Sequence, residues 1–191
     1  MANNKPYYEE IIIAGFGGQG IMLAGKLLAQ AAMISGKEVT YMPSYGAEVR
    51  GGTANCILVI ADEQVASPMF TKADTAIVMN KASLIKFAPA IKAGGLLVTN
   101  SSLIDIEPEV DKSIEILKVP ADDIAVELGN QKIANMVILG AYLQKRGVIR
   151  VDKMADCLAD VLANRLHNTI PLNTQALLRG AEFAKANKTI T

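Results

Sequence analysis

The sequence predicts an α/β fold in which a mainly parallel sheet lies between two layers of helices, with further helices at the C-terminus. A β-branched run that ends at Ala14 leads into the glycine-rich stretch GFGGQG, residues 15–20, and then into an apolar helical segment. Short apolar runs alternate with longer segments of helical periodicity along most of the chain. Because parallel neighbours need a crossover connection, this alternation favours a parallel sheet covered on both faces.

The first half of the chain is predicted to begin with a strand and a helix. Residues 10–14 are rich in isoleucine, which is typical of a strand buried on both faces. Residues 21–34 carry apolar side chains at helical spacing, and Ser35 and Gly36 end that helix. A second helix is expected to follow the fourth strand despite Pro89. The ranges are 38–42, 55–60, 75–80 and 96–99 for the next strands and 81–92 for this helix.

The second half is predicted to be mainly helical. After a sixth strand over residues 114–119, the sequence PADD opens a helical stretch to Arg146, with a break near Gly129. Asp152 is expected to cap a helix that reaches Leu166, and residues 172–187 form the last helix. We find no repeat, low-complexity tract or linker. We therefore expect one Rossmann-like, three-layer α/β/α domain over residues 1–191, with its core at 10–146 and C-terminal helices over 151–187.

Composition excludes several classes of function. Nineteen basic and nineteen acidic residues give a net charge of zero, without a charged block that would indicate nucleic acid or a membrane surface. The two cysteines, Cys56 and Cys157, are too few for an iron–sulfur cluster or a zinc site, and His167 is the only histidine. The N-terminus lacks a signal-peptide pattern, and no apolar run is long enough to span a membrane. We expect a cytoplasmic protein that binds a small molecule or protein partner, with no catalytic residue or metal ligand of its own.

The glycine-rich stretch has the pattern of a dinucleotide-binding loop. Gly15 permits a tight turn, Gly17 allows backbone to approach a phosphate, and Gly20 allows close packing of helix on strand. Together with Gly18 and Gln19, these residues place backbone amides at a helix N-terminus, where a phosphate can bind. The acidic residue that holds the ribose of NAD is missing after the second predicted strand. A loop that serves packing alone, without a ligand, is the alternative.

A second candidate loop is PSYGAEVRGGTAN, residues 43–55, which contains Glu48, Arg50, Gly51 and Gly52. An arginine beside two glycines suits a phosphate or carboxylate at a strand end, whereas the alternative is a tight turn with a surface ion pair. Asn135 is the third candidate, because it stands in an apolar helix and needs a hydrogen-bond partner if buried. It could orient the glycine loop or contact a ligand, and a helix-packing bond is the commoner role.

Four motifs occur in the order of one known family: GFGGQGIMLAGKLLAQAA, YGAEVRGGTANC, SPMFTKADTAIVMN and GNQKIANMVILGAYL. The chain resembles the gamma subunit of the 2-oxoacid:ferredoxin (acceptor) oxidoreductases, which is also fused as a domain into single-chain pyruvate:ferredoxin oxidoreductases. The resemblance runs from Ile11 to Arg146 and weakens in the last helices. The sequence SYGAEVRGG looks more like the 2-oxoglutarate branch than the pyruvate branch.

The resemblance implies a complex that converts a 2-oxoacid and coenzyme A to acyl-CoA and CO2 and reduces ferredoxin or a similar acceptor. Thiamine diphosphate, Mg and [4Fe-4S] clusters would belong to the alpha, beta and delta (ferredoxin-like) subunits. This chain would contribute coenzyme A binding and subunit packing, be inactive alone and be free to self-associate. The candidate ligand residues are Gly15, Gly17, Gly18, Gln19, Gly20, Glu48, Arg50, Gly51, Gly52 and Asn135.

Three alternatives remain open for the function. The first is the pyruvate or branched-chain 2-oxoacid branch of the same family. The second is a free-standing NAD- or ATP-binding enzyme, which the missing acidic residue disfavours. The third is a structural module without a ligand.

Overall fold

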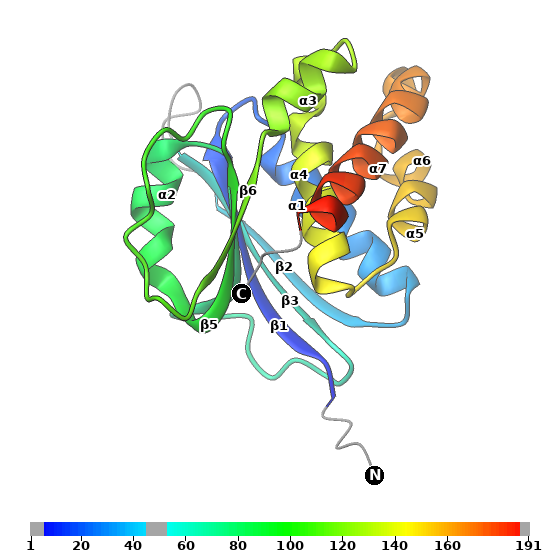
Figure 1. Cartoon of the computed structure of the whole chain (residues 1–191). Coiled ribbons are helices and arrows are strands. Elements are labelled where there is room, and N and C mark those ends of the chain that lie inside the picture. Colours follow the sequence, from blue (N-terminus) through cyan, green and yellow to red (C-terminus); the bar gives the residue numbers. More distant parts are fainter. Residues whose placement is uncertain (1–5, 45–52, 188–191) are drawn as a thin grey trace.

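The computed structural model describes residues 6–44 and 53–187 (Figure 1). In these two ranges six strands form one sheet in the order β2-β3-β1-β4-β5-β6. The strands are β1 (Tyr8–Phe16), β2 (Glu38–Ser44), β3 (Thr53–Ala61), β4 (Ala73–Val78), β5 (Ile91–Asn100) and β6 (Glu115–Val119). Strand β1 lies near the centre, where its three isoleucines are buried, as its sequence predicts.

The sheet is mostly parallel, which confirms the predicted fold class. β1 pairs in parallel with β4, β4 with β5, and β5 with β6. β3 runs antiparallel to both of its neighbours, β1 and β2. The periodicity of the sequence contains no information about strand direction, so the reversed strand was not predicted.

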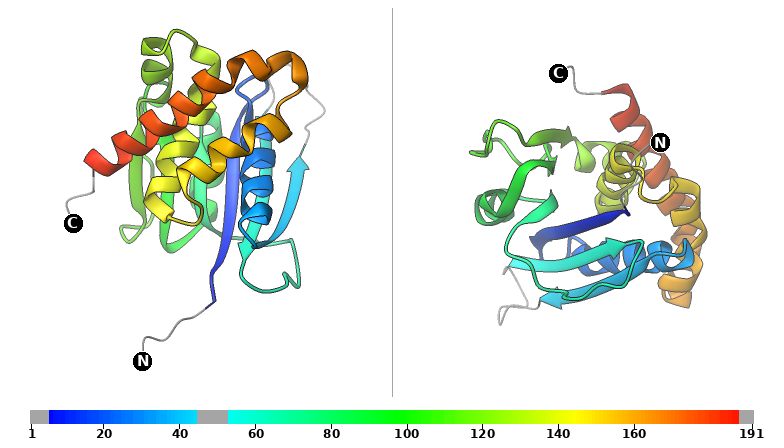
Figure 2. Two further views of the ribbon diagram at one scale, coloured as in Figure 1. Left: turned by 90° about the vertical axis from the view of Figure 1, so that its right-hand side faces the viewer. Right: turned by 90° about the horizontal axis from the view of Figure 1, so that it is seen from below.

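Helices cover both faces of the sheet and complete the three layers (Figures 1 and 2). One face carries α1 (Ile21–Ile34), α3 (Ala121–Glu127), α4 (Ala134–Arg146), α5 (Val151–Asp156), α6 (Leu158–Val161) and α7 (Ile170–Ala186), and the other carries α2 (Lys81–Phe87). Short 3-10 segments occur at Ala88–Ala90, Gln131–Ile133 and Asn164–Thr169. Two separate clusters of buried apolar side chains, one on each side of the sheet, form the core.

Two predicted helices end earlier than expected. The helix predicted over 81–92 ends at Phe87, because Pro89 lies in a 3-10 turn and β5 already begins at Ile91. The helix predicted from Asp152 to Leu166 is divided into α5, α6 and a 3-10 segment. Asp152 does not cap it: the capping position is Arg150, and Asp152 lies in the first turn, where it pairs with Arg150. The predicted break near Gly129 is confirmed, with φ of +89°.

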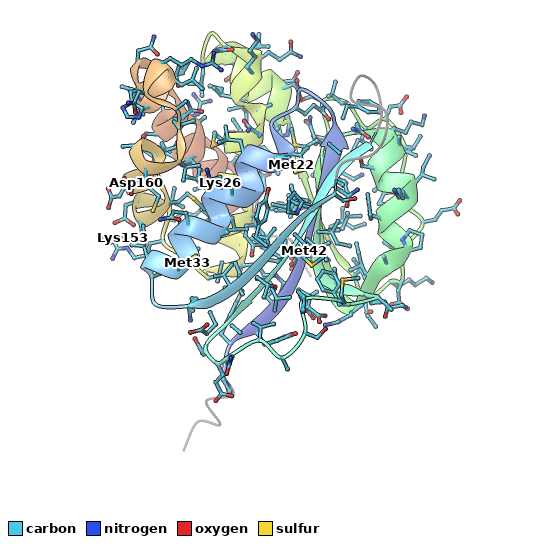
Figure 3. All side chains as sticks on the ribbon, turned by 180° about the vertical axis from the view of Figure 1, so that it is seen from behind. Met22, Lys26, Met33, Met42, Lys153 and Asp160 are labelled. Atoms are coloured by element: carbon cyan, nitrogen blue, oxygen red, sulfur yellow. The ribbon has the colours of Figure 1, made fainter. Side chains whose placement is uncertain are left out.

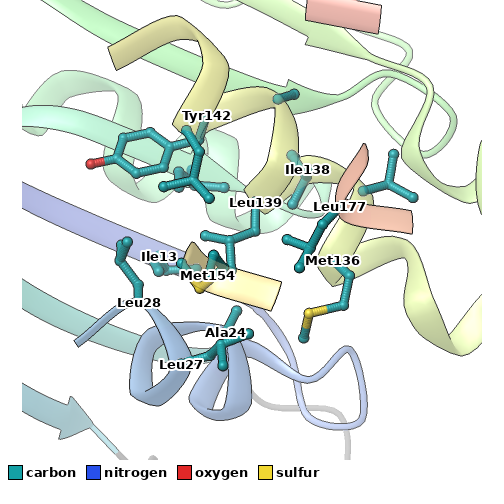
Figure 4. Packing of buried hydrophobic residues seen from close by; sticks show 14 of the residues in the cluster. Ile13, Ala24, Leu27, Leu28, Met136, Ile138, Leu139, Tyr142, Met154 and Leu177 are labelled. Carbon is teal, nitrogen blue, oxygen red and sulfur yellow. The ribbon is translucent and has the colours of Figure 1, made fainter. Parts of the chain in front are cut away.

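The helical layer is held together by an unusually close contact between α4 and α7. A Cβ atom on Gly140 would lie 2.0 Å from the carbonyl oxygen of Leu177, and one on Gly180 would lie 1.8 Å from that of Val137. Buried side chains of α1, α4, α5 and β1 fill the space beneath (Figure 4). This layer fixes the position of α4 relative to β1, and therefore the position of Asn135 at the start of α4 relative to the glycine loop.

Candidate functional site

The glycine loop lies at the carboxyl end of β1, where β1 and β4 are parallel neighbours and α1 leaves toward β2. Ligands bind at such switch points in open α/β sheets. Gly18 and Gly20 have φ values of +101° and +72°, which favour glycine. The first helical bond runs from Ala24 N to Gly20 O, so the amides just before Ala24 have no carbonyl one turn back to bond. The helix end therefore offers donors for an anion.

Gln19 holds the loop in place and does not point freely into solvent. Its Oε1 accepts hydrogen bonds from Phe16 N at 2.7 Å and from Asn80 Nδ2 at 3.0 Å, and its Nε2 donates to Met79 O at 3.3 Å. Gly15 leaves room for this arrangement, because a Cβ there would lie 2.6 Å from Gln19 Oε1. The side chain thereby ties the loop to the end of β4.

Asn135, at the start of α4, contacts the same loop. Its Nδ2 donates to Gly20 O at 3.2 Å, and the side chain is buried. A Cβ atom at Gly20 would lie 2.3 Å from Asn135 Nδ2, so glycine is required there by space as well as by φ. Two specific roles were considered for Asn135, namely orienting the glycine loop and contacting a ligand. The structure contains the contact with the glycine loop.

A cavity of about 210 Å³ opens beside the loop. Its walls include Gly18, Gln19, Met79, Asp122, Gln131 and Asn135. Asp122 is almost fully buried, and its carboxylate accepts from Asn100 Nδ2 at 2.5 Å and from Gln131 Nε2 at 2.8 Å. Asn100 Oδ1 in turn accepts from Ala121 N at 3.2 Å. The cavity is therefore lined by hydrogen-bonded amide groups, one buried carboxylate, Lys132 and the apolar residues Met79 and Leu103.

Asn100, Asp122 and Gln131 were not predicted as site residues. The available signal was their position, because Asn100 ends a strand and Asp122 opens a helix directly after another strand. Carboxyl ends of neighbouring parallel strands meet at one edge of the sheet. Their convergence became visible only when the order of β4, β5 and β6 was known.

The second predicted loop, residues 43–55, is described only at its two ends. Glu48, Arg50, Gly51 and Gly52 lie outside the described residues. The described strands on either side end near the glycine loop, since Phe16 of β1 pairs with Thr53 of β3 and Ser44 of β2 pairs with Asn55. The segment between Ser44 and Thr53 therefore starts and ends at the edge of the sheet that carries the candidate site.

Lys26, Cys56, Cys157 and His167 do not line this cavity. Lys26 is exposed on the outer face of α1 (Figure 3). Cys56 is buried against α1, and burial raises the pKa of its thiol to about 12, as expected for a small apolar side chain. Burial also raises the pKa of Cys157. The ring Nε2 of His167 lies 3.1 Å from Leu162 O.

No group of three or more His, Cys, Asp or Glu side chains in residues 6–44 and 53–187 could hold a metal ion. Within the same ranges, no helix has the length and apolar character needed to cross a membrane.

Similarity to known proteins shows the family of this chain. The family model described as pyruvate ferredoxin/flavodoxin oxidoreductase matches residues 10–183. The chain belongs to this family. It is 34% identical over 188 residues to ketoisovalerate oxidoreductase subunit VorA of Methanothermobacter marburgensis, covering 96% of this chain and 38% of VorA. The chain thus spans less than half the length of that relative.

Other relatives are similar over nearly their whole length. The 2-oxoglutarate synthase subunit KorC of Methanocaldococcus jannaschii is 34% identical over 181 residues, which is 93% of this chain and 94% of KorC. The solved gamma subunit of a keto/oxoacid ferredoxin oxidoreductase from Geobacter sulfurreducens has a TM-score of 0.83 at 28% identity, over 96% of this chain and 99% of that subunit. The family member described here is therefore similar to gamma-type subunits of 2-oxoacid:ferredoxin oxidoreductases.

A further solved structure contains ligands. The 2-oxoglutarate:ferredoxin oxidoreductase of Magnetococcus marinus, with 2-oxoglutarate, coenzyme A and succinyl-CoA bound, has a TM-score of 0.86 at 26% identity. The alignment covers 95% of this chain and 32% of that one.

Proposed function

We propose that this chain is the gamma subunit of a 2-oxoacid:ferredoxin oxidoreductase and that it binds coenzyme A at the glycine loop. The observation that carries the proposal is the position of the loop at a switch point of the sheet, in a chain of this family, beside helix amides that bond to no backbone carbonyl of the described residues. Thiamine diphosphate, Mg and [4Fe-4S] clusters would be held by alpha, beta and delta subunits, and ferredoxin would be reduced through the complex. The chain itself would be cytoplasmic and inactive alone.

Within the complex, the backbone amides of the loop Gly17 to Gly20 and of the first turn of α1 would bind the pyrophosphate of coenzyme A, apart from Gln19 N, which already donates to Phe16 O at 3.2 Å. Gln19 and Asn135 support this role, because their bonds hold the loop in one conformation before a ligand arrives. Arg50 would pair with the ribose 3'-phosphate, and Glu48, Gly51 and Gly52 would shape that loop. The position of Ser44 and Thr53 beside the glycine loop supports a shared site.

The branch that we favour is the 2-oxoglutarate branch. It rests on the sequence SYGAEVRGG and on the similarity to KorC over nearly the full length of both chains. A branched-chain 2-oxoacid is the second candidate, because VorA is equally identical, at 34%. The alternative is that the glycine loop serves packing alone and binds no ligand. The same internal bonds of Gln19 and Asn135 are compatible with this alternative.

The first experiment identifies the complex and its substrate. The tagged chain is purified without oxygen from its own cells, its partners are identified by mass spectrometry, and dye reduction is measured with each of 2-oxoglutarate, pyruvate and ketoisovalerate. We expect larger thiamine and iron–sulfur subunits, activity that requires coenzyme A, and a preference for 2-oxoglutarate. A chain recovered without such subunits would refute the subunit assignment.

The second experiment tests the ligand site with Arg50→Ala. We expect the KM for coenzyme A to rise by about tenfold to a hundredfold, which corresponds to loss of a charge-assisted pair with phosphate. Dephospho-coenzyme A, which lacks the 3'-phosphate, should show no such difference between the two proteins. Lys26→Ala is the matched control, because Lys26 is exposed on α1 away from the cavity. Equal effects of Arg50→Ala on both ligands would exclude the 3'-phosphate contact.

A further inference from the structure

A second feature lies at the other side of the molecule, along the free edge of β6. This strand is the last in the sheet order and pairs only with β5 among the described residues. A groove of about 830 Å³ opens at the start of this strand, with residues 112–116 and Gly94 of β5 as one wall and the ends of α4 and α7 opposite. We call this feature the β6 groove. Its volume exceeds that of the cavity beside the glycine loop, and the glycine loop does not line it.

The backbone of β6 leaves hydrogen-bonding groups unused at this edge. Val119 O accepts from Ser101 N at 2.8 Å, which shows that Val119 directs its backbone toward β5. Since backbone direction alternates along a strand, Ile116 and Lys118 direct their N–H and C=O groups away from β5. No described backbone group is bonded to them. Such an edge is a template for an additional strand.

The charged side chains of the groove indicate the charge of a segment that could pair with β6. Lys112 and Lys185 line it and are exposed, and neither forms an ion pair with the described part of the chain. Lys145 also lines the groove and is paired with Glu115. Lysines at a sheet edge oppose pairing with a second copy of the same edge, because like charges would then face one another. The same lysines favour an acidic segment.

We propose that the β6 groove binds an extended, acidic segment of a partner protein, which adds a strand to the sheet beside β6. The backbone groups of Ile116 and Lys118 would supply the ladder, and Lys112 and Lys185 would pair with carboxylates of the segment. The proposal rests on the proposed membership of the chain in a complex, and it is independent of the coenzyme A site and of the oxoacid that the complex uses.

The proposal is tested on the complex that purifies with the full-length chain. Hydrogen exchange is compared between the complex and the isolated chain. The amides of Ile116 and Lys118 should exchange slowly only in the complex, whereas those of Glu115, Leu117 and Val119 should be protected in both. A carbodiimide, which joins amines to carboxylates in contact, should link Lys112 or Lys185 to Asp or Glu residues of a partner.

A charge-reversal variant provides a second, matched measurement. Lys112→Glu with Lys185→Glu should weaken the partner's binding by about tenfold to a hundredfold. The control is Lys26→Glu with Lys153→Glu, which makes the same change of charge on α1 and α5 (Figure 3) and should leave binding unchanged. Both variants are checked for an unaltered unfolding transition.

Several outcomes would overturn the proposal. These are unchanged exchange at Ile116 and Lys118 in the complex, equal weakening by the two charge-reversal variants, or a chain that purifies without any partner. A crosslink from Lys112 or Lys185 to a second copy, or to the carboxyl terminus of its own chain, would identify a different occupant and would also overturn it.

Discussion

Replacement of Gly20 by alanine tests the contact between the glycine loop and α4. Gly20 has φ of +72°, and its new Cβ would lie 2.3 Å from Asn135 Nδ2. The left-handed backbone costs an L-residue about 1–2 kcal/mol. Displacement of the buried Asn135 amide would add about 1–3 kcal/mol, because it would lose its bond to Gly20 O without access to water. We therefore expect the free energy of unfolding to fall by about 2–5 kcal/mol.

Gly36→Ala is the matched control for this substitution. Gly36 has φ of +80°, and nothing lies within 4 Å of the position of its Cβ. It carries the backbone cost without the collision, so the expected loss is only about 1–2 kcal/mol. Urea unfolding followed by circular dichroism measures both variants, provided that the m-values agree.

Equal losses for the two glycines would refute the reasoning, because the contact with Asn135 would then cost nothing. A double variant gives an internal check. When Gly20→Ala is combined with Asn135→Ala, the collision is removed, so the combined loss should be smaller than the sum of the two separate losses. A purely additive result would also contradict the proposed contact.

Three further predictions concern the core and the buried polar groups. Gly180→Ala should cost about 3 kcal/mol in urea unfolding, because its Cβ would meet the backbone of Val137 at 1.8 Å, and a loss below about 1 kcal/mol would mean that the two helices separate easily. With a pKa of about 12 and no exposure, Cys56 should react with iodoacetamide at pH 8.5 only after unfolding, as mass spectrometry would show. Burial and the nearby Glu9 raise the pKa of Tyr142 well above its usual value. Its contribution to stability is complete below about pH 10, the pKa in the unfolded chain, and is lost as the pH rises further, so Tyr142→Phe should flatten the fall in stability measured in urea above pH 10.

The local elements were predictable because their signals are local. The bounds of α1, Ile21–Ile34, agree with the apolar spacing and the Ser35 and Gly36 stop. The helix predicted over 81–92 is too long, because Pro89 lies in a 3-10 turn directly after Phe87, where the helix ends. The antiparallel direction of β3 and the strand order were not predictable in the same way, because both depend on pairing between distant segments.

The candidate site also has one part that a local motif predicts and one part that depends on the strand order. The glycine loop follows from a short motif between a strand and a helix, and the sequence indicated it directly. The buried carboxylate of Asp122 accepts hydrogen bonds from Asn100 and Gln131. The three residues belong to three different elements. No spacing rule joins these residues. Only the parallel order of β4, β5 and β6 brings them to the edge that carries the loop.

The residues of the proposed site are of two kinds: some form hydrogen bonds within the protein, and others would contact only the ligand. Gln19 and Asn135 use their amide groups on the protein itself, so their loss would change stability and ligand affinity together. A residue that contacts only the ligand would change affinity and leave stability unaltered. The proposed role of Arg50 belongs to the second kind, and that of Gly20 to the first. Parallel measurement of unfolding and of the KM for coenzyme A therefore distinguishes a loop that binds a ligand from one that only packs, because packing alone leaves no residue in the second group.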